Sequence, residues 1–305
     1  MSGTADPVEG DTVDPDEGDD LRYCSIASVD GVVVTIWENV DIVGDLLGGL
    51  GRPRPPRGGP PGKHPICLEF WRVRADKWGK PNVNDSWLRP MRWWTNLSAG
   101  IVGAYREVMI RIPNVVKQQV RSPMFSFVPR MYTDSAIALW GDRALEYGFN
   151  KHRARISDVE RGEYRVHSVR DGSVLLDARL LAPTFPQGTS PGGHADWLRQ
   201  PLLGHLGGGR IAVSRLDRRA MNGASIPIAG VVALSDHFLA GLPQADHAIE
   251  PLGPANPWGA FAFRNVRMLL EYPRHAKLER DGQADSRSRS ASRSRGTSRS
   301  SEKLR

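Results

Sequence analysis

Seven segments of the chain are rich in β-branched and aromatic residues, and several of them alternate apolar with polar positions. They span residues 32–37, 66–74, 107–112, 164–169, 173–179, 210–214 and 260–272. A period of two is typical of a strand with one buried face and one solvated face. Because antiparallel sheets tolerate one wet face, the pattern predicts a mainly β (α+β) fold with mostly antiparallel strands.

The two ends of the chain differ in composition from this body. Residues 1–20 contain eight acidic groups and no lysine or arginine, and residues 279–305 are rich in arginine and serine. Neither segment has enough apolar residues to offset the entropy lost on ordering, so both are predicted to be disordered. The folded domain is therefore expected to span residues 21–278, with a Pro/Gly/Arg-rich surface loop at residues 50–64.

The arginine-serine tail contributes to the formal net charge of +7. Such a charge suits weak contact with RNA or another polyanion. No aromatic residue stands between the arginines to stack on bases, however. A solvated tail is therefore favoured over a nucleic-acid-binding one.

Cysteine use and hydropathy favour a cytoplasmic protein that does not enter a membrane. Cys24 and Cys67 are too few for a disulfide framework, and no apolar run approaches the roughly 18 residues of a membrane span. The acidic N-terminal segment is the reverse of a signal peptide. The histidines other than His152 show no metal-ligand spacing, and no glycine-rich phosphate loop stands before a helix, so no metal or organic cofactor is expected.

Lys151 is the candidate nucleophile. It follows residues 134–147, which are predicted to form a helix with Asp134 or Ser135 as its N-cap. The face expected to be buried consists of Ala136, Leu139, Trp140, Ala144 and Tyr147. Gly148 is expected to end the helix and to place Lys151 on the turn beyond it.

A lysine attacks a carbonyl group only as the neutral amine, and the pKa of free lysine is about 10.4. Burial and a nearby positive charge both lower that pKa. The apolar and the charged neighbours available for this are Tyr147, Phe149 and Ile156, and His152, Arg153 and Arg155, respectively. The C-terminal end of a helix favours a cation, so desolvation is expected to have the larger effect.

Three motifs occur in order between Ser98 and Ile156. They are Tyr105-Arg-Glu107 at the start of an apolar strand, Tyr132-Thr-Asp-Ser-Ala-Ile-Ala138, and Gly148-Phe-Asn-Lys-His152. In these motifs the chain resembles the acetoacetate decarboxylase family. Its members carry Tyr-x-Glu, Tyr-x-Asp-x-x-x-Ala-Ile-Ala and Gly-Phe-Pro-Lys-Lys at similar spacing. The resemblance covers about 60 residues.

The resemblance implies a strongly curved antiparallel β-sheet, a cone-like barrel around a central pocket with peripheral helices, in a chain that forms a homo-oligomer. It also implies that Lys151 forms a Schiff base with a small keto acid, and that Glu107 positions or protonates the substrate. In this family the reactive lysine is an amine activated by burial next to another cation. The implied substrate-binding residues are Tyr105, Trp37, Tyr132 and Phe149.

The chain departs from the family pattern at several positions. His152 replaces the second lysine, which in the family helps to keep the first amine unprotonated, and a histidine with a pKa near 6.5 is mostly neutral at pH 7. Asn150 replaces the proline before the lysine. Gly141-Asp-Arg143 lies about two residues too early to match the family's Gly-Arg-Glu. Trp37 aligns with an arginine that has been linked to the substrate carboxylate.

The loss of that arginine argues against simple decarboxylation, because a carboxylate in an apolar pocket needs a charged or hydrogen-bonding partner. Two reactions stay open: that of a decarboxylase-like carbon–carbon lyase, and that of an aldol or dehydratase variant. The alternative function is a protein that binds a small molecule on the same scaffold without turnover.

Overall fold

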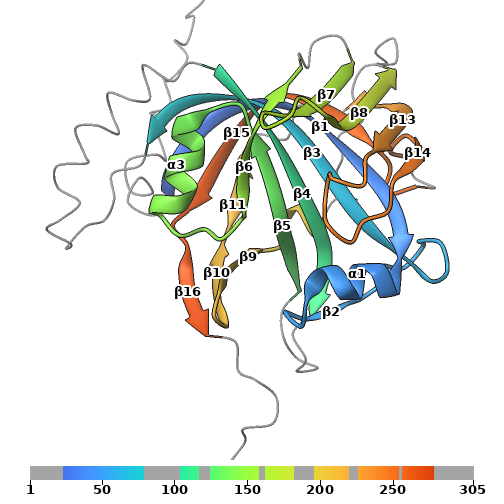
Figure 1. Cartoon of the computed structure of the whole chain (residues 1–305), viewed down its shortest axis with the longest axis horizontal. Helices are drawn as coiled ribbons and strands as arrows, with labels where there is room; N and C mark the ends of the chain where they lie inside the picture. The colour runs from blue at the N-terminus through green and yellow to red at the C-terminus, as the bar shows by residue number, and fades with distance from the viewer. Residues whose placement is uncertain are drawn as a thin grey trace, which may run out of the picture.

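The computed structural model describes residues 23–78, 104–116, 124–157, 162–181, 196–219, 226–253 and 256–277. The predictions for residues 1–20 and 279–305 lie outside these ranges. Within them the chain is mostly β, with short helices at the periphery (Figure 1). The mainly β fold class predicted from the alternating segments is confirmed.

The helices of the described chain are α1 (Val40–Leu47), α3 (Ala136–Ala144) and the 3-10 helix η3 (Asp196–Arg199). The strands are β1 (Tyr23–Asn39), β2 (Arg52–Pro53), β3 (Lys63–Trp78), β4 (Ala104–Val116), β5 (Phe125–Thr133), β6 (Lys151–Ile156), β7 (Glu163–Ser168), β8 (Val174–Leu181), β9 (Leu202–Gly207), β10 (Arg210–Ser214), β11 (Leu216–Arg219), β12 (Ile226–Pro227), β13 (Ala229–Leu234), β14 (Ala245–Ile249), β15 (Phe261–Glu271) and β16 (Arg274–Lys277). The two α-helices of the described residues span eight and nine residues, and neither is long enough to cross a membrane.

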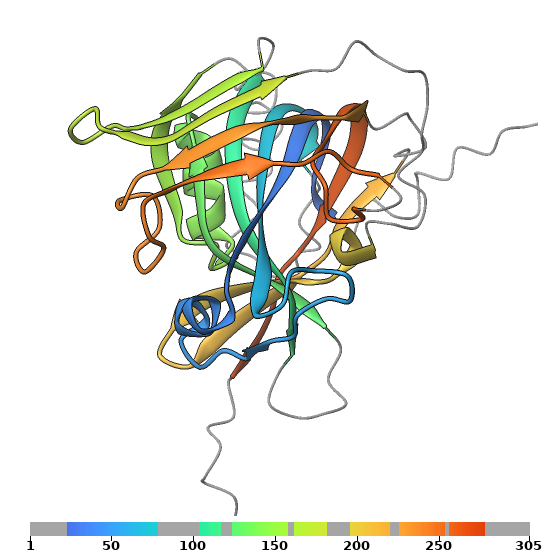
Figure 2. The same ribbon diagram turned by 90° about the vertical axis from the view of Figure 1, so that its right-hand side faces the viewer.

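The strands form one curled sheet with the order β11-β15-β1-β3-β4-β5-β6-β7-β8-β13-β14. Strands β7, β8, β13 and β14 cross above the long strands β1, β3 and β4 (Figure 2). Most neighbours are antiparallel, as expected, but β5 pairs with β6 and with β9 in parallel. The strongly curved antiparallel sheet implied by the resemblance is therefore present.

The curl gives the central strands two buried faces. Alternate residues of β3 point into different apolar clusters: Leu68 and Phe70 contribute to one, and Trp71 and Val73 to the other. The first cluster also contains Val43 and Leu47 of α1, and the second also contains Ala138 of α3. Strand β4 is buried along nearly all its length for this reason, and its buried residues include the charged Glu107 and Arg111.

All seven strands predicted from the sequence are present, but the prediction for the helix needs correction. The helix α3 spans Ala136–Ala144 rather than residues 134–147, and Ser135 caps it by accepting a hydrogen bond from the Ala138 amide. Its buried face is also different, since Trp140 is 54% exposed whereas Ala138 is buried. Helix α1 and strands β5 and β6 are among the elements not predicted.

A buried ion pair joins β3 to β4 within the second cluster. Arg111 Nε lies 2.7 Å from Glu69 Oε1, and neither side chain is exposed. The guanidinium also donates to the Leu198 carbonyl and lies over the ring of Trp197. The contacts with Leu198 and Trp197 attach η3 to the sheet. Removing one member of a buried ion pair leaves an uncompensated charge and typically costs about 3–5 kcal/mol of folding stability.

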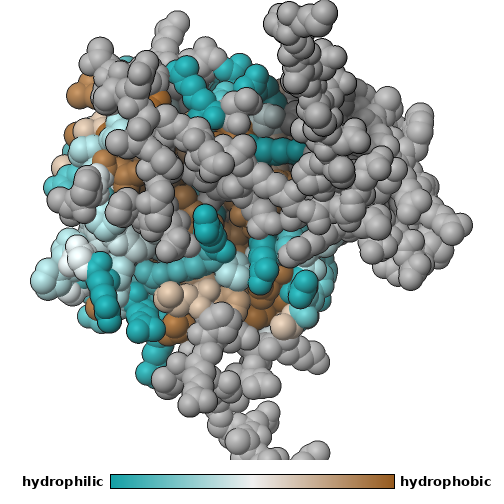
Figure 3. All heavy atoms as spheres, turned by 180° about the vertical axis from the view of Figure 1, so that it is seen from behind, coloured by the Kyte–Doolittle hydropathy of each residue, from teal (hydrophilic) through white to brown (hydrophobic). Residues whose placement is uncertain are grey.

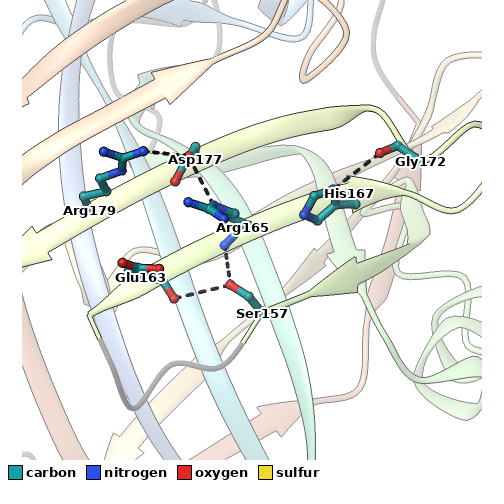
Figure 4. Close-up of polar contacts among 7 residues, drawn as sticks. All are labelled: Ser157, Glu163, Arg165, His167, Gly172, Asp177 and Arg179. Atoms are coloured by element: carbon teal, nitrogen blue, oxygen red, sulfur yellow. Dashed lines mark hydrogen bonds and ion pairs between the residues drawn. The ribbon is translucent and has the colours of Figure 1, made fainter.

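Polar side chains cover the outer side of the β7–β8 hairpin (Figure 4). Arg165 donates from Nε to Asp177 Oδ2 at 3.2 Å, and Arg179 lies 3.8 Å from the same oxygen. The Ser157 hydroxyl accepts from the Arg165 amide and donates to the Glu163 carbonyl. The rear of the molecule shows both hydrophilic and hydrophobic side chains on its described part (Figure 3).

His64 is fully buried on β3, and its Nε2 donates to the Pro113 carbonyl at 2.8 Å. Burial lowers its pKa from 6.5 to about 4, although the bond to Pro113 opposes this. A lowered pKa means that the folded chain holds the neutral imidazole while the unfolded chain takes up a proton. The contribution of neutral His64 to the stability of the folded chain is therefore fully present above pH 6.5 and is lost as the pH falls from 6.5 towards 4.

We expect the free energy of unfolding to fall between pH 6.5 and 4 by as much as about 3 kcal/mol more than in the His64→Gln variant. Glutamine retains a donor for Pro113 but does not titrate. Urea denaturation at several pH values measures the difference, and His237→Gln, which changes an exposed histidine, serves as the control. Equal pH dependence in the native chain and His64→Gln would contradict the assignment.

Candidate active site

Lys151 and Glu107 form a close ion pair inside the curled sheet. Lys151 Nζ lies 2.6 Å from Glu107 Oε1, and the two side chains are 10% and 6% exposed. The carboxylate accepts a hydrogen bond from the ammonium group. Of the seven residues predicted for the site, these two are in direct contact.

The register of four strands explains why they meet. Glu107 on β4 pairs with Thr133 on β5 and with Trp71 on β3. Two residues further along β4, Met109 pairs with Met131, which in turn pairs with Lys151 on β6. Because residues two apart point to the same face of a sheet, the side chains of Glu107, Met109, Met131 and Lys151 share one face.

These side chains line a cavity of about 80 Å³, which we call the inner cavity. Its described lining also includes residues of α3, of the turn after it, and of β9, β11 and β15. The lining residues are Trp71, Tyr105, Glu107, Met109, Met131, Ala138, Gly141, Asp142, Leu145, Tyr147, Phe149, Lys151, Leu202, Leu216 and Leu270. Most of them are apolar, so the ion pair faces a site with little competing hydrogen bonding.

The turn between α3 and β6 fixes the position of Lys151. Glu146, Gly148 and Asn150 all have positive φ angles, of 52°, 70° and 48°, so the chain reverses through left-handed conformations. The Gly148 carbonyl accepts from the His205 amide of β9 at 2.9 Å. The Tyr147 hydroxyl donates to the Glu271 carbonyl of β15 at 2.8 Å. The turn before the lysine is thus attached at two points to strands distant in sequence.

Asp142 is a site residue that the sequence analysis did not select. Ala138, Gly141, Asp142 and Leu145 follow the spacing i, i+3, i+4, i+7, and all of them line the inner cavity. The side chain of Asp142 is buried, and its Oδ1 has no hydrogen-bond partner among the described residues. An acidic residue on the helical stripe that precedes the lysine is the signal that could have identified it.

The electrostatic surroundings of Asp142 favour its protonated form. Burial is the main cause that raises the pKa of Asp142 above its ordinary value, and the negative charge of Glu107 raises it further. The positive charges of Lys151 and Arg143 and a hydrogen bond from the Phe149 amide act in the opposite direction. The net result is a carboxyl group with a raised pKa, close to an ion pair.

His152 follows Lys151 on β6. Its Nε2 lies 3.0 Å from Asn150 Oδ1, and its ring stands 6.1 Å from the ring of Tyr132. Burial, followed by the positive charges of Arg130 and Arg143, lowers the pKa of His152 below 6.5. The imidazole is therefore neutral at pH 7 and is not a source of positive charge for Lys151.

A second, more open cleft adjoins the inner cavity, and we call it the outer cleft. Lys151 and Asp142 line both spaces. The remaining described lining of the outer cleft consists of Phe127, Val128, Pro129, Arg143, Glu146, Gly148, Asn150, His152, His205, Leu206 and Arg210. Lys151 and Asp142 thus stand at the junction between an apolar cavity and a polar cleft.

The other predicted site residues divide between the two faces of the sheet. Tyr105 and Phe149 line the inner cavity. Tyr132 does not, because it belongs to the opposite face and donates its hydroxyl hydrogen to the Phe238 carbonyl. Trp37 is also absent from the described lining and packs edge-on against Trp258 at 6.1 Å.

The arrangement suits chemistry by an amine and two carboxyl groups. The described residues contain no group of three or more His, Cys, Asp or Glu side chains that could hold a metal ion. Lys151 can act as a nucleophile or a cation, Glu107 can accept its proton, and Asp142 can donate or accept a hydrogen bond.

Comparison with protein-family models gave no match, and neither did comparison with curated protein sequences. The fold is similar to solved structures of three enzymes. An acetoacetate decarboxylase from Legionella pneumophila is 13% identical with a TM-score of 0.49, over 83% of this chain and 87% of that one. The enduracididine biosynthesis enzyme MppR is 13% identical with a TM-score of 0.46, over the same shares of 83% and 87%.

The third is an acetoacetate decarboxylase-like enzyme from Sphingomonas wittichii RW1. It is 12% identical with a TM-score of 0.43, over 85% of this chain and 96% of that one. TM-scores below 0.5 at such identities carry no argument about function. The chemistry of the inner cavity has to be judged from the side chains that line it.

The close packing of β9 against the turn generates a prediction for Gly204. A Cβ atom at Gly204 would lie 1.9 Å from the Tyr147 carbonyl oxygen, which is backbone and cannot rotate away. We expect Gly204→Ala to lower the free energy of unfolding by about 2 kcal/mol or more, as is usual for forced backbone shifts. Denaturant titration measures the loss.

Gly44 on α1 provides the matched control, since an added Cβ there has no described atom within 4 Å. Gly44→Ala is expected to leave stability unchanged or to raise it slightly, because alanine favours a helix. A Gly204→Ala variant as stable as the native chain would show that the turn and β9 are less closely packed.

Proposed function

We propose that the chain is an enzyme that uses Lys151 to form a Schiff base with a small keto acid. The observation that carries the proposal is the Lys151–Glu107 pair. It places a buried amine 2.6 Å from a proton acceptor, on the wall of an apolar cavity. Such a site excludes bulk water from the reacting groups, which favours condensation over hydrolysis.

The first step is proton transfer within the pair. The amine carries a proton in the ion pair and becomes a nucleophile when that proton moves to Glu107. The neutral amine then adds to the keto carbon, and its second proton compensates the charge that develops on the oxygen. Glu107 then returns its proton to the hydroxyl group of the resulting carbinolamine, which leaves as water and gives an iminium ion on Lys151.

The iminium ion acts as an electron sink. It accepts the electron pair of a carbon–carbon or carbon–hydrogen bond next to it, which produces an enamine. After loss of carbon dioxide, protonation of the enamine and hydrolysis of the iminium ion that results complete a decarboxylation. Attack of the enamine on an aldehyde begins an aldol condensation followed by dehydration. Both reactions use the same lysine, and no metal or organic cofactor takes part in either.

The size of the inner cavity favours a small substrate. A water molecule needs about 10–15 Å³ on a comparable measure, so a cavity of about 80 Å³ accommodates a molecule of a few non-hydrogen atoms. Pyruvate and acetoacetate are of this size. A longer substrate has to extend into the outer cleft.

A binding protein without turnover is the second candidate function. Two observations favour it. The ammonium of Lys151 is already neutralised by Glu107. In addition, the three residues expected to lower the pKa of the lysine are exposed and lie outside the described lining of the inner cavity; they are His152, Arg153 and Arg155. In that case Lys151 binds an oxygen of the ligand as a cation.

Borohydride trapping separates the two functions. We expect incubation with pyruvate at neutral pH, followed by reduction, to attach the ligand to Lys151, as mapped by mass spectrometry. The adduct should be absent from Lys151→Ala and unchanged in Lys63→Ala, which removes an exposed lysine. An adduct that forms only near pH 10 would favour the binding protein.

Exchange of the pyruvate methyl hydrogens in heavy water tests the role of Glu107. We expect Glu107→Gln to slow this exchange at least about 100-fold, because an amide cannot shuttle protons during enamine formation. Trapping on Lys151 should persist, since the amine no longer has an anionic partner that holds its proton. Nuclear magnetic resonance measures the exchange rate.

Glu163→Gln is the matched control, because Glu163 is an exposed residue at the start of β7. It should exchange the methyl hydrogens at the native rate. Unchanged exchange in Glu107→Gln would remove Glu107 from the proton transfers.

A further inference from the structure

Two buried polar atoms without a hydrogen-bond partner belong to residues that line the inner cavity. One is Oδ1 of Asp142 on α3, and the other is Nε1 of Trp71 on β3. Asp142 is 9% exposed and Trp71 is 6% exposed. Neither atom has a partner among the described residues, whereas the Tyr147 hydroxyl on the same cavity is satisfied by the Glu271 carbonyl.

Unsatisfied buried polar groups are uncommon and costly. Most buried polar side-chain atoms have a partner, and each one without it loses the hydrogen bond that it made to water in the unfolded chain. Two such residues on one small cavity are therefore informative about its contents. A ligand that brings oxygen atoms satisfies both, since an indole N–H and a protonated carboxyl group are both donors.

The two residues lie on different walls around the reacting pair. Trp71 is the antiparallel partner of Glu107, so their side chains are neighbours on one face of the sheet. Asp142 lies on the helix that covers this face, and its charge interacts with both Lys151 and Glu107. A ligand joined to Lys151 thus lies within a space bounded by both.

We propose that Asp142 and Trp71 form a carboxylate-binding subsite of the inner cavity, in which the Asp142 carboxyl group and the Trp71 indole N–H hydrogen-bond to the carboxylate of a small keto acid; this rests on the proposed function of Lys151. The subsite takes the role that an arginine plays in many carboxylate sites. It gives the site its preference for keto acids over simple ketones.

The charges in the cavity support a neutral donor. Among the described residues that line it, Lys151 is the one cationic side chain, and Glu107 already neutralises it. A carboxylate in such a cavity requires strong hydrogen bonds, and an O–H donor to a carboxylate gives a short one. An ionised Asp142 would instead repel the ligand.

Several groups around Asp142 influence its protonation. Lys151 on β6 and Glu107 on β4 face it across the cavity, Arg143 is next to it on α3, and the Phe149 amide donates to it. Burial, the main cause, raises the pKa of Asp142. The further charged or titratable groups on the outer-cleft side are Glu146, His152, His205 and Arg210.

The test compares pyruvate with acetone, which lacks a carboxylate, on the full-length chain. Calorimetry measures pyruvate affinity between pH 5 and pH 8.5, and borohydride trapping measures half-saturation for both compounds. We expect Asp142→Ala to weaken pyruvate binding roughly tenfold or more, and Trp71→Phe to weaken it less. Neither variant should change half-saturation by acetone.

The pH dependence distinguishes the protonated carboxyl from other roles. Pyruvate affinity of the native chain should fall as the pH rises through the pKa of Asp142, because the donor proton is lost and a like charge replaces it. Asp142→Asn keeps an N–H donor at every pH, so this variant should bind pyruvate with little of that dependence. Asp177→Asn, the same change on the outer side of β8, should match the native chain (Figure 4).

Equal pyruvate affinity in the native chain, Asp142→Ala and Trp71→Phe would overturn the subsite. Equal losses for pyruvate and acetone would also overturn it, since they would indicate a purely structural role. Binding of pyruvate that depends on Asp142 but gives no adduct on Lys151 would support the subsite and contradict the Schiff-base function. Formation of an adduct on Lys151 that does not depend on Asp142 would support the Schiff-base function and contradict the subsite. Absence of any pyruvate binding would also overturn the subsite.

Discussion

The parallel pairing of β5 with β6 is the constraint on which the site depends. Two parallel neighbours cannot be joined by a tight turn, so the chain between them has to cross over a face of the sheet. Here the crossover contains α3, and it passes over the face that carries Glu107, Met109 and Met131. The same crossover therefore closes the inner cavity, contributes Asp142 to it and returns the chain at Lys151. In an all-antiparallel sheet, none of these three results would follow.

Two buried ion pairs of the described residues have different surroundings. Glu69 and Arg111 are fully buried, and Arg111 has further contacts with Leu198 and Trp197. Glu107 and Lys151 retain slight exposure and border a cavity. Buried charges with many fixed partners hold elements together, whereas a pair beside open space can change its protonation and its partners. This contrast, rather than burial alone, is the reason for proposing the second pair as the reactive one.

Much of the fold could be predicted from the sequence. Strands β7, β8 and β15 alternate apolar and polar residues because one of their faces is more exposed, and the buried strands β1, β3 and β4 are rich in apolar residues. Strand β6 was not predicted, since Lys151, His152 and Arg153 read as a charged turn; its strand conformation comes from pairing with β5 and β7. The motifs placed Lys151 and Glu107 in one site, but their direct contact was not predicted. Asp142 was not predicted, because the buried face of the helix was placed on Trp140 and Asp142 lies on another face. Trp71 was not predicted either, since its place beside Glu107 and its unsatisfied indole nitrogen are known only from the structure.

The contact of Gly204 with Tyr147 has a consequence for how this chain can vary. The backbone of β9 leaves no room for a side chain where it meets the turn before Lys151, and a hydrogen bond from His205 to Gly148 joins the two segments. A change in the length or path of that turn requires β9 to shift with it. Among related sequences, the turn and β9 are thus expected to evolve as one unit, with glycine at position 204 wherever the turn keeps its present course. The surroundings of Lys151 therefore depend on two stretches of chain that are distant in sequence.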